Sequence, residues 1–115
     1  MNNKELQKGT TSTLVLKVVS KNDCYGYDII KQIASLSDNC FNLKQGTLYP
    51  ILHNLEKDKL IESYWSEQAN QRKRKYYKIT KRGLASLKQN QKEWVQFRNT
   101  VDQLLAVAHM PCLEV

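Results

Sequence analysis

The polar residues between positions 44 and 57 have the types and spacing of a surface that binds another molecule. Apolar residues recur there every three or four positions, which is typical of a helix with one buried stripe. They are Leu48, Ile51, Leu52 and Leu55. The opposite face then carries Gln45, Tyr49, His53, Asn54 and Lys57. Amides and a phenol can hydrogen-bond base edges or phosphates, and a lysine can neutralise a phosphate. An ordinary solvated helix would also show such a face, so this helix alone leaves both interpretations open.

A strongly basic segment follows this helix. Between Gln71 and Arg82 there is no acidic residue, and the positive residues are Arg72, Lys73, Arg74, Lys75, Lys78, Lys81 and Arg82. Over all 115 residues, 18 Lys and Arg outnumber 11 Asp and Glu, which gives a net charge of +7. This balance favours a polyanionic partner, either nucleic acid or an anionic membrane surface.

The sequence offers little for catalysis, metal binding or membrane insertion. Cys24, Cys40 and Cys112 form no C-x-x-C pair, and His53 and His109 lie far apart. No Ser-His-Asp or Cys-His pairing and no phosphate-binding glycine loop is evident. No apolar run approaches the roughly 20 residues of a spanning helix. We therefore expect a cytoplasmic protein without enzymatic activity, cofactor or metal, with reduced thiols; a redox-sensing cysteine stays open.

The elements that position these residues follow from periodicity. Helices are predicted over 4–20 and 26–36, the second with a buried stripe of Ile29, Ile30, Ile33 and Leu36. The third begins near Lys44, with Pro50 tightening or kinking its start. Residues 60–65 and 75–79 are rich in β-branched and aromatic residues and predict the two strands of a hairpin.

A long last helix is predicted from Lys81 to about Ala108, with Thr80 as its N-terminal cap. Its apolar stripe has nothing in its own chain to cover it fully, so we expect two copies to pair through it. The predicted dimer interface consists of Leu84, Leu87, Trp94, Phe97, Val101, Leu104 and Leu105. Residues 110–115, around Pro111, are expected to form a loose tail.

Three helices followed by a hairpin is the element order of a winged helix-turn-helix. The predicted fold class is therefore mainly α with a small β-hairpin. Residues 1–80 would form the DNA-binding domain, 81–109 the dimerisation helix and 110–115 the tail. In this fold the third helix enters the major groove and the hairpin tip, or wing, lies along the DNA backbone. The polar helix face and the basic hairpin then become one DNA-binding surface.

The sequence resembles the PadR family of bacterial transcriptional regulators, in particular its short branch with one C-terminal helix. The resemblance covers about residues 6–108. It rests on Tyr25-Gly26-Tyr27-Asp28-Ile29-Ile30, on Gly46-Thr47-Leu48-Tyr49-Pro50, on Leu55-Glu56-Lys57-Asp58 with Leu60-Ile61, on Arg74-Lys75-Tyr76-Tyr77, and on Ile79-Thr80 with Gly83. One departure is Lys59, which stands where the family often has glycine.

This resemblance implies a homodimeric repressor that binds a palindromic operator, commonly beside its own gene and that of a transporter or stress protein. Thr47 and Tyr49 match family positions at the DNA-facing start of the third helix, and Arg74 and Lys75 match the wing. We expect Gln45, His53 and Asn54 to read base edges and the wing cations to release counterions. The full predicted set is Lys44, Gln45, Thr47, Tyr49, His53, Asn54, Arg72, Lys73, Arg74 and Lys75.

Trp94 resembles a family tryptophan near the dimer axis, where some relatives bind flat aromatic compounds. The resemblance implies that the first helix also lines such an effector pocket, and by their spacing Leu6, Thr10 and Thr13 could share its wall with Trp94. The other interpretation is that Trp94 is core of the dimer, which Arg98 one turn later favours by opposing a cationic ligand. Two further alternatives stay open: a repressor without an effector, and a winged-helix adaptor whose basic wing binds an acidic protein.

Overall fold

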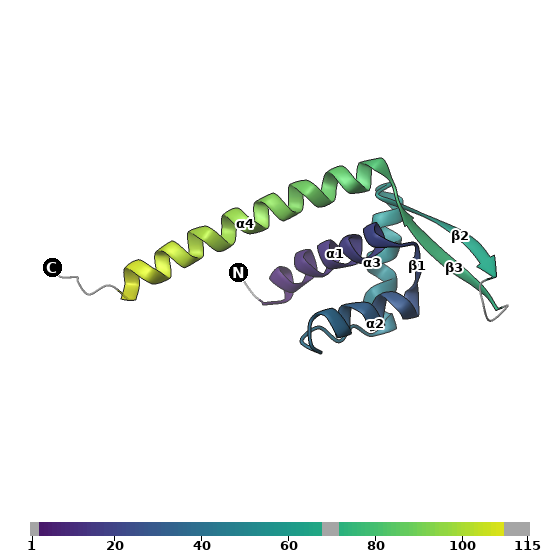
Figure 1. Ribbon diagram of the computed structural model, residues 1–115, viewed down its shortest axis with the longest axis horizontal. Coiled ribbons are helices and arrows are strands. Elements are labelled where there is room, and N and C mark those ends of the chain that lie inside the picture. Colours follow the sequence, from purple (N-terminus) through teal and green to yellow (C-terminus); the bar gives the residue numbers. More distant parts are fainter. Residues whose placement is uncertain (1–2, 68–71, 110–115) are drawn as a thin grey trace.

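The computed structural model of the protein describes residues 3–67 and 72–109, with the side chains of residues 9–67 and 72–106. In this part of the chain the elements are α1 (Asn3–Lys21), β1 (Cys24–Tyr25), α2 (Gly26–Leu36), α3 (Gln45–Lys57), β2 (Ile61–Glu67), β3 (Lys73–Ile79) and α4 (Lys81–His109). The first three helices pack together, the hairpin of β2 and β3 projects at one end, and α4 runs away in the opposite direction (Figure 1). The tip of the wing, residues 68–71, and the predicted tail, residues 110–115, lie outside the described residues.

The predicted fold class, mainly α with a small β-sheet and a long last helix, is confirmed. The observed bounds of the helices also agree with the predicted ones to within one or two residues. The sheet, however, has three strands in the order β1-β3-β2. Strand β1, in which Cys24 lies opposite Tyr77 and Tyr25 opposite Tyr76, was not predicted. Two residues are too few to show the alternation that predicts a strand.

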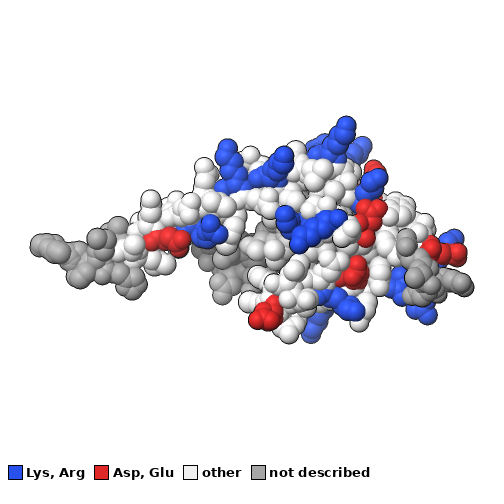
Figure 2. Space-filling view, in the orientation of Figure 1, with Lys and Arg blue, Asp and Glu red and all other residues white. Residues whose placement is uncertain are grey.

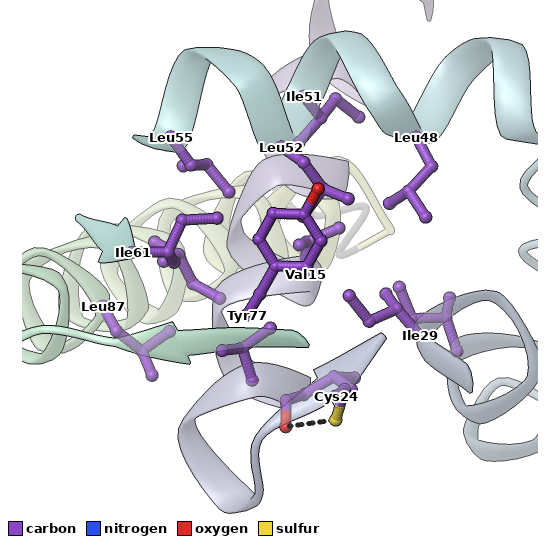
Figure 3. Packing of buried hydrophobic residues seen from close by; sticks show 14 residues of the cluster. Val15, Cys24, Ile29, Leu48, Ile51, Leu52, Leu55, Ile61, Tyr77 and Leu87 are labelled. Carbon is purple, nitrogen blue, oxygen red and sulfur yellow. Dashed lines mark hydrogen bonds between the residues drawn. The ribbon is translucent and has the colours of Figure 1, made fainter. Parts of the chain in front are cut away.

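The hydrophobic core lies between α3, α1, the first half of α2 and the hairpin. The predicted α3 stripe of Leu48, Ile51, Leu52 and Leu55 is buried, and Tyr77 of β3 points between α3 and Val15 of α1 (Figure 3). Leu36 was predicted in the buried stripe of α2 but is 64% exposed. It is the last residue of its helix, where the chain turns away from the core at Ser37.

The helices of the helix-turn-helix, α2 and α3, end in the same backbone arrangement. After α3, the Lys59 amide donates to Glu56 and the Leu60 amide to Leu55, which is a Schellman motif. After α2, the Asp38 and Asn39 amides donate to Ser35 and Ala34 in the same pattern. The residues at the left-handed position are Asp38, with φ 56°, and Lys59, with φ 63°. Lys59 thus occupies a conformation that favours glycine.

The start of α4 is fixed to the base of the hairpin. The Thr80 hydroxyl accepts a hydrogen bond from the Gly83 amide at 2.9 Å, which confirms the predicted cap. Gly83 is buried, and a Cβ there would lie 2.0 Å from the Leu60 carbonyl oxygen. Only glycine permits this approach of α4 to the residue before β2.

Candidate nucleic-acid interface

The polar face of α3 is open to solvent because the opposite stripe fixes the rotation of the helix. Once Leu48, Leu52 and Leu55 are buried, side chains on the far side must point outward. The exposed residues of α3 and its N-terminal cap include all six of the predicted DNA-binding residues in this region: Lys44, Gln45, Thr47, Tyr49, His53 and Asn54. The helix therefore offers a continuous polar surface.

The first turn of α3 is closed by a shared hydrogen bond, while the expected effect of Pro50 on this turn stays a prediction. The Lys44 carbonyl accepts from both the Thr47 and the Leu48 amides, each at 2.9 Å. A bond shared between the third and fourth residue is common where a helix begins in a 3₁₀-like turn. Lys44 makes no side-chain cap. The amides at the N-terminal end of α3 carry partial positive charge, and the Lys44 side chain does not bond to them.

Tyr49 links α3 to the beginning of α2. A Cβ on Gly26 would lie 2.6 Å from the Tyr49 hydroxyl oxygen and 3.1 Å from the adjacent ring carbon. Glycine at position 26 therefore provides the space in which the phenol rests. The Tyr49 side chain nevertheless stays 46% exposed. One part of it packs on α2 and the rest remains available at the surface.

The basic residues of the wing are divided between its two faces. Because successive residues of a strand point to opposite sides, Lys73 and Lys75 share the face of Tyr77, while Arg74 shares that of Tyr76. The Lys75 ammonium lies 5.8 Å from the centre of the Tyr77 ring. The Arg74 guanidinium lies 4.3 Å from the centre of the Tyr25 ring. The basic run therefore places positive charge on both faces of the wing.

A groove joins the wing to α3 and the start of α2. It has a volume of about 550 Å³ and is lined by Tyr25, Gly26, Tyr27, Gln45, Tyr49, Trp65, Arg72, Arg74, Lys75 and Tyr77. It brings together five of the predicted residues, two from α3 and three from the wing. Apart from Tyr49, the aromatic residues of the groove, notably Trp65 on β2, were not among the predicted residues. Strand alternation from buried Ile61 through Ser63 could have placed Trp65 on this side.

A second hollow, of about 680 Å³, lies along α3 and the loop before it. Its lining includes three further predicted residues, Lys44, Thr47 and Asn54, together with Thr11, Cys40, Phe41, Asn42, Leu43, Gly46, Pro50 and Ile51. The predicted residues His53 and Lys73 line neither hollow. The predicted DNA-binding residues are thus spread over the exposed face of α3 and the wing and do not line one common hollow.

Positive charge extends beyond α3 and the wing. Figure 2 shows Lys and Arg side chains gathered along α4 and around its junction with the sheet, with few acidic groups between them. The exposed basic residues of α4 include Lys81, Arg82, Lys88 and Lys92. An excess of positive charge spread in this way attracts a polyanion at long range without specifying its sequence.

Cys24 is a buried thiol that is not suited to react. Its hydrogen donates to the Asn22 carbonyl at 3.0 Å, and the Gln32 amide donates to its sulfur at 3.5 Å. Burial, together with the nearby carboxylate of Asp28, raises the pKa of the Cys24 thiol from 9.0 to about 11. Near neutral pH the reactive thiolate is therefore scarce. Cys40 is exposed, and Cys112 lies outside the described residues.

Among the residues described, no three His, Cys, Asp or Glu side chains gather into a possible metal site. Nor does any described helix have the length and apolar character needed to cross a membrane.

The apolar stripe of α4 is largely exposed in the single chain. Leu84, Trp94, Phe97, Leu104 and Leu105 are exposed, and Val101 is half-buried. Leu87 is the exception to the predicted interface: only 4% exposed, it belongs to the core of its own chain. Its place in the interface is corrected, because the first turns of α4 pack on α1 and the sheet.

The residues predicted for an effector pocket are not enclosed in the single chain. Trp94 is 46% exposed, and its ring lies 5.9 Å from that of Phe97. Thr10 and Thr13 are half-buried, and the Thr13 hydroxyl donates to the Gly9 carbonyl within α1. The side chain of Leu6 lies outside the described residues. The effector pocket stays a prediction.

Comparison with known proteins gives the same fold and one family. A protein of unknown function from Lysinibacillus sphaericus is 35% identical over 98 residues, which span 85% of this chain and 90% of that protein. A PadR-like transcriptional regulator from Bacillus cereus superposes with a TM-score of 0.79 at 31% identity, over 88% of this chain and 96% of its own. A PadR family regulator from Clostridium difficile gives 0.73 at 38%, over 82% and 96%.

The family model described as "Transcriptional regulator PadR-like family" matches residues 15–89. This region runs from the middle of α1 through the wing and into α4, so it includes α3 and the groove beside it. Proteins of this family are DNA-binding regulators and not enzymes. The chain therefore belongs to the PadR-like family of transcriptional regulators.

Proposed function

We propose that this regulator is a homodimeric repressor that binds a palindromic operator through α3 and the wing. The observation that carries the proposal is the groove in which α3 residues Gln45 and Tyr49 meet the wing cations Arg72, Arg74 and Lys75. A helix of this kind inserted in the major groove presents amide and phenol groups to base edges and phosphates. The wing cations then neutralise the neighbouring backbone.

Residue roles follow from position. Gln45, His53 and Asn54 read base edges, Thr47 and Tyr49 hold phosphates, and the wing residues supply salt-dependent affinity. The adaptor alternative is less well supported, because an adaptor would bury part of the α3 polar face, whereas all of its predicted residues are exposed. In this division of the chain, residues 1–80 bind DNA and 81–109 dimerise, with Leu87 completing the core of the DNA-binding part.

Dimerisation through α4 explains its exposed stripe. Trp94, Phe97, Val101 and Leu104 are spaced by three, four and three residues, the spacing of a coiled-coil seam. Pairing two copies along it buries apolar surface and repeats α3 by two-fold symmetry. A two-fold dimer binds two half-sites in opposite orientation, which is why we infer a palindromic operator.

The test is binding to labelled duplex DNA from upstream of the protein's own gene, beside a scrambled duplex of equal length and composition, over a range of salt concentrations. A sequence-reading regulator binds the first at least roughly 10³-fold more tightly at one salt concentration. Equal and steeply salt-dependent binding to both duplexes would restrict the finding to electrostatic attraction. Selection from random duplexes would then show whether any operator exists, and its failure would reject sequence-specific repression.

A further inference from the structure

The exposed tryptophan of the wing has no role in the function proposed so far. Trp65 lies on β2 and is 63% exposed, although indole is among the most costly side chains to leave in water. Its cross-strand neighbour is Lys75. The sequence resemblance drew attention to the basic residues of the wing and not to this one.

The sheet directs Trp65 toward α3. On the same face of β2, Ile61 is buried and the Ser63 hydroxyl donates to the Glu56 carboxylate of α3 at 2.6 Å. Trp65 is the next residue on that face, one step closer to the wing tip. It therefore lies beyond the place where α3 touches the sheet and lines the groove with Gln45 and Tyr49.

The composition of this groove suits one kind of occupant. Its lining combines aromatic rings, among them Tyr27, Tyr49 and Trp65, with the cations Arg72, Arg74 and Lys75. A chain of deoxyribose and phosphate units offers both an apolar sugar face and an anion at each step. If α3 occupies the major groove, the strand that borders that groove passes between α3 and the wing. The aromatic walls then meet sugars and the cations meet phosphates.

We propose that Trp65 is a DNA-backbone contact, packing its indole ring on the deoxyribose of the strand that passes between the wing and α3. This inference rests on the proposed function. The contact carries no base information, so it supports affinity for every sequence and fixes the wing relative to α3. It also accounts for the exposure of the indole in the free protein, since DNA covers it in the complex.

Fluorescence tests the contact directly, because Trp65 and Trp94 are the two tryptophans of the chain. In a Trp94→Phe variant all tryptophan emission comes from Trp65. The probes are the duplex from upstream of the gene and its scrambled partner, with binding followed independently by anisotropy of a label on the DNA. We expect DNA to lower the acrylamide quenching of Trp65 by at least about twofold, in step with anisotropy, as burial of an exposed ring requires.

Substitution gives the second measurement. Trp65→Ala should weaken binding to both duplexes by a similar factor, on the order of tenfold, since one large apolar contact is lost. Trp65→Phe should recover part of this loss. The matched control is Tyr64→Ala, which removes an aromatic ring from the opposite face of the same strand, where Tyr64 stacks on Tyr76 at 5.8 Å. It should leave DNA affinity unchanged.

The outcomes separate the two proposals. If DNA binds and yet neither the quenching of Trp65 nor the affinity of Trp65→Ala changes, the Trp65 contact is rejected while the regulator function stands. If Trp65→Ala affects only the upstream duplex, the residue reads sequence and the backbone contact is likewise rejected. If no duplex is bound by the unmodified protein, both proposals fail together.

Discussion

At the scale of single residues, the contact of Gly26 with Tyr49 connects a non-polar position in α2 to the face of α3 that we propose binds DNA. The glycine has no side chain to offer, and its effect is to leave room for a phenol that belongs to another helix. We therefore expect Gly26 to influence DNA binding without touching DNA.

We predict that Gly26→Ala weakens DNA binding with little change in thermal stability. The new methyl group must displace the Tyr49 hydroxyl, which can move because the ring is at the surface. The loss should be comparable to that of Tyr49→Ala, and the double variant should bind no worse than Tyr49→Ala alone, because both changes remove one interaction. Binding isotherms of the three variants measure this. Additive losses would show that Gly26 acts independently of Tyr49, and Gly9→Ala, in open space, is the control.

Cys24 gives a prediction about alkaline pH. Its pKa is raised in the folded protein, so the folded state keeps its proton more tightly than the unfolded state does. The contribution to folding free energy is fully present below pH 9.0 and is lost as pH rises from there to about 11. Denaturant unfolding across this range should show stability falling more steeply in the natural protein than in Cys24→Ala.

The comparison with Cys24→Ala is needed because two tyrosines titrate nearby. A hydrogen bond to Asp23 raises the pKa of Tyr64 to about 12, and burial raises that of Tyr77. These groups are present in both proteins and cancel in the difference. Equal slopes for the natural protein and the variant over this pH range would show that Cys24 does not titrate as its surroundings require.

At the scale of elements, the turn after α3 holds a lysine where the backbone favours glycine. Lys59 has a φ of 63° and closes the Schellman motif that directs the chain from α3 into β2. The family resemblance identified position 59 as a departure, and the structure shows its physical meaning: the backbone conformation is kept although the side chain disfavours it.

We predict that Lys59→Gly stabilises the protein by about 0.5–1 kcal/mol. Relief of the left-handed strain, roughly 1–2 kcal/mol, exceeds the added flexibility of glycine in the unfolded chain, roughly 0.4–1 kcal/mol. Denaturant unfolding measures the change. The matched control is Lys57→Gly, two residues earlier within the last turn of α3, which should lose about 1 kcal/mol. A Lys59→Gly protein no more stable than the natural one would contradict the argument.

The sequence predicted long helices well. It predicted short strands poorly, and also the burial of residues near the helix ends. The bounds of α2 follow from its Ile29 and Ile33 spacing over three turns, whereas β1 is too short to leave any pattern. Leu36 and Leu87 share the periodicity of their neighbours, yet one is exposed and the other buried in its own chain. Their burial depends on which element packs against them, and periodicity in one helix does not contain that information.

The surface residues show the same limit. Side chains of α3 could be placed on the open face once its stripe was known. The division of Arg74 and Lys75 between two faces of the wing, and the position of Trp65 beside α3, depend on the sheet register. That register depends on pairing with β1 and on contacts with α3. Neither can be read from the basic sequence of residues 72–75 alone.

At the scale of the whole molecule, α4 gives the chain its elongated shape, with extents of 68 × 28 × 23 Å. We predict that Leu104→Lys converts the protein to a monomer, measured by sedimentation equilibrium, and that it weakens operator binding. A charge within the seam would have to be buried without a partner. The control is Leu36→Lys, which places the same charge on an equally exposed leucine of α2. If the Leu104→Lys protein remains dimeric, the apolar stripe of α4 is not the dimer interface.

The close approach at Gly83 has a consequence for the geometry of such a dimer. Because α4 touches the backbone of Leu60 there and Leu87 lies in the core, the helix cannot swing independently of the wing and α3. Any change in the angle at which two copies of α4 cross must move each DNA-binding part as a rigid body. A rotation of about 10° over a helix of roughly 43 Å displaces its far end by about 7.5 Å, close to two base-pair steps. In the proposed dimer, the crossing angle of the helices would therefore set the spacing of the half-sites that the two copies of α3 can reach.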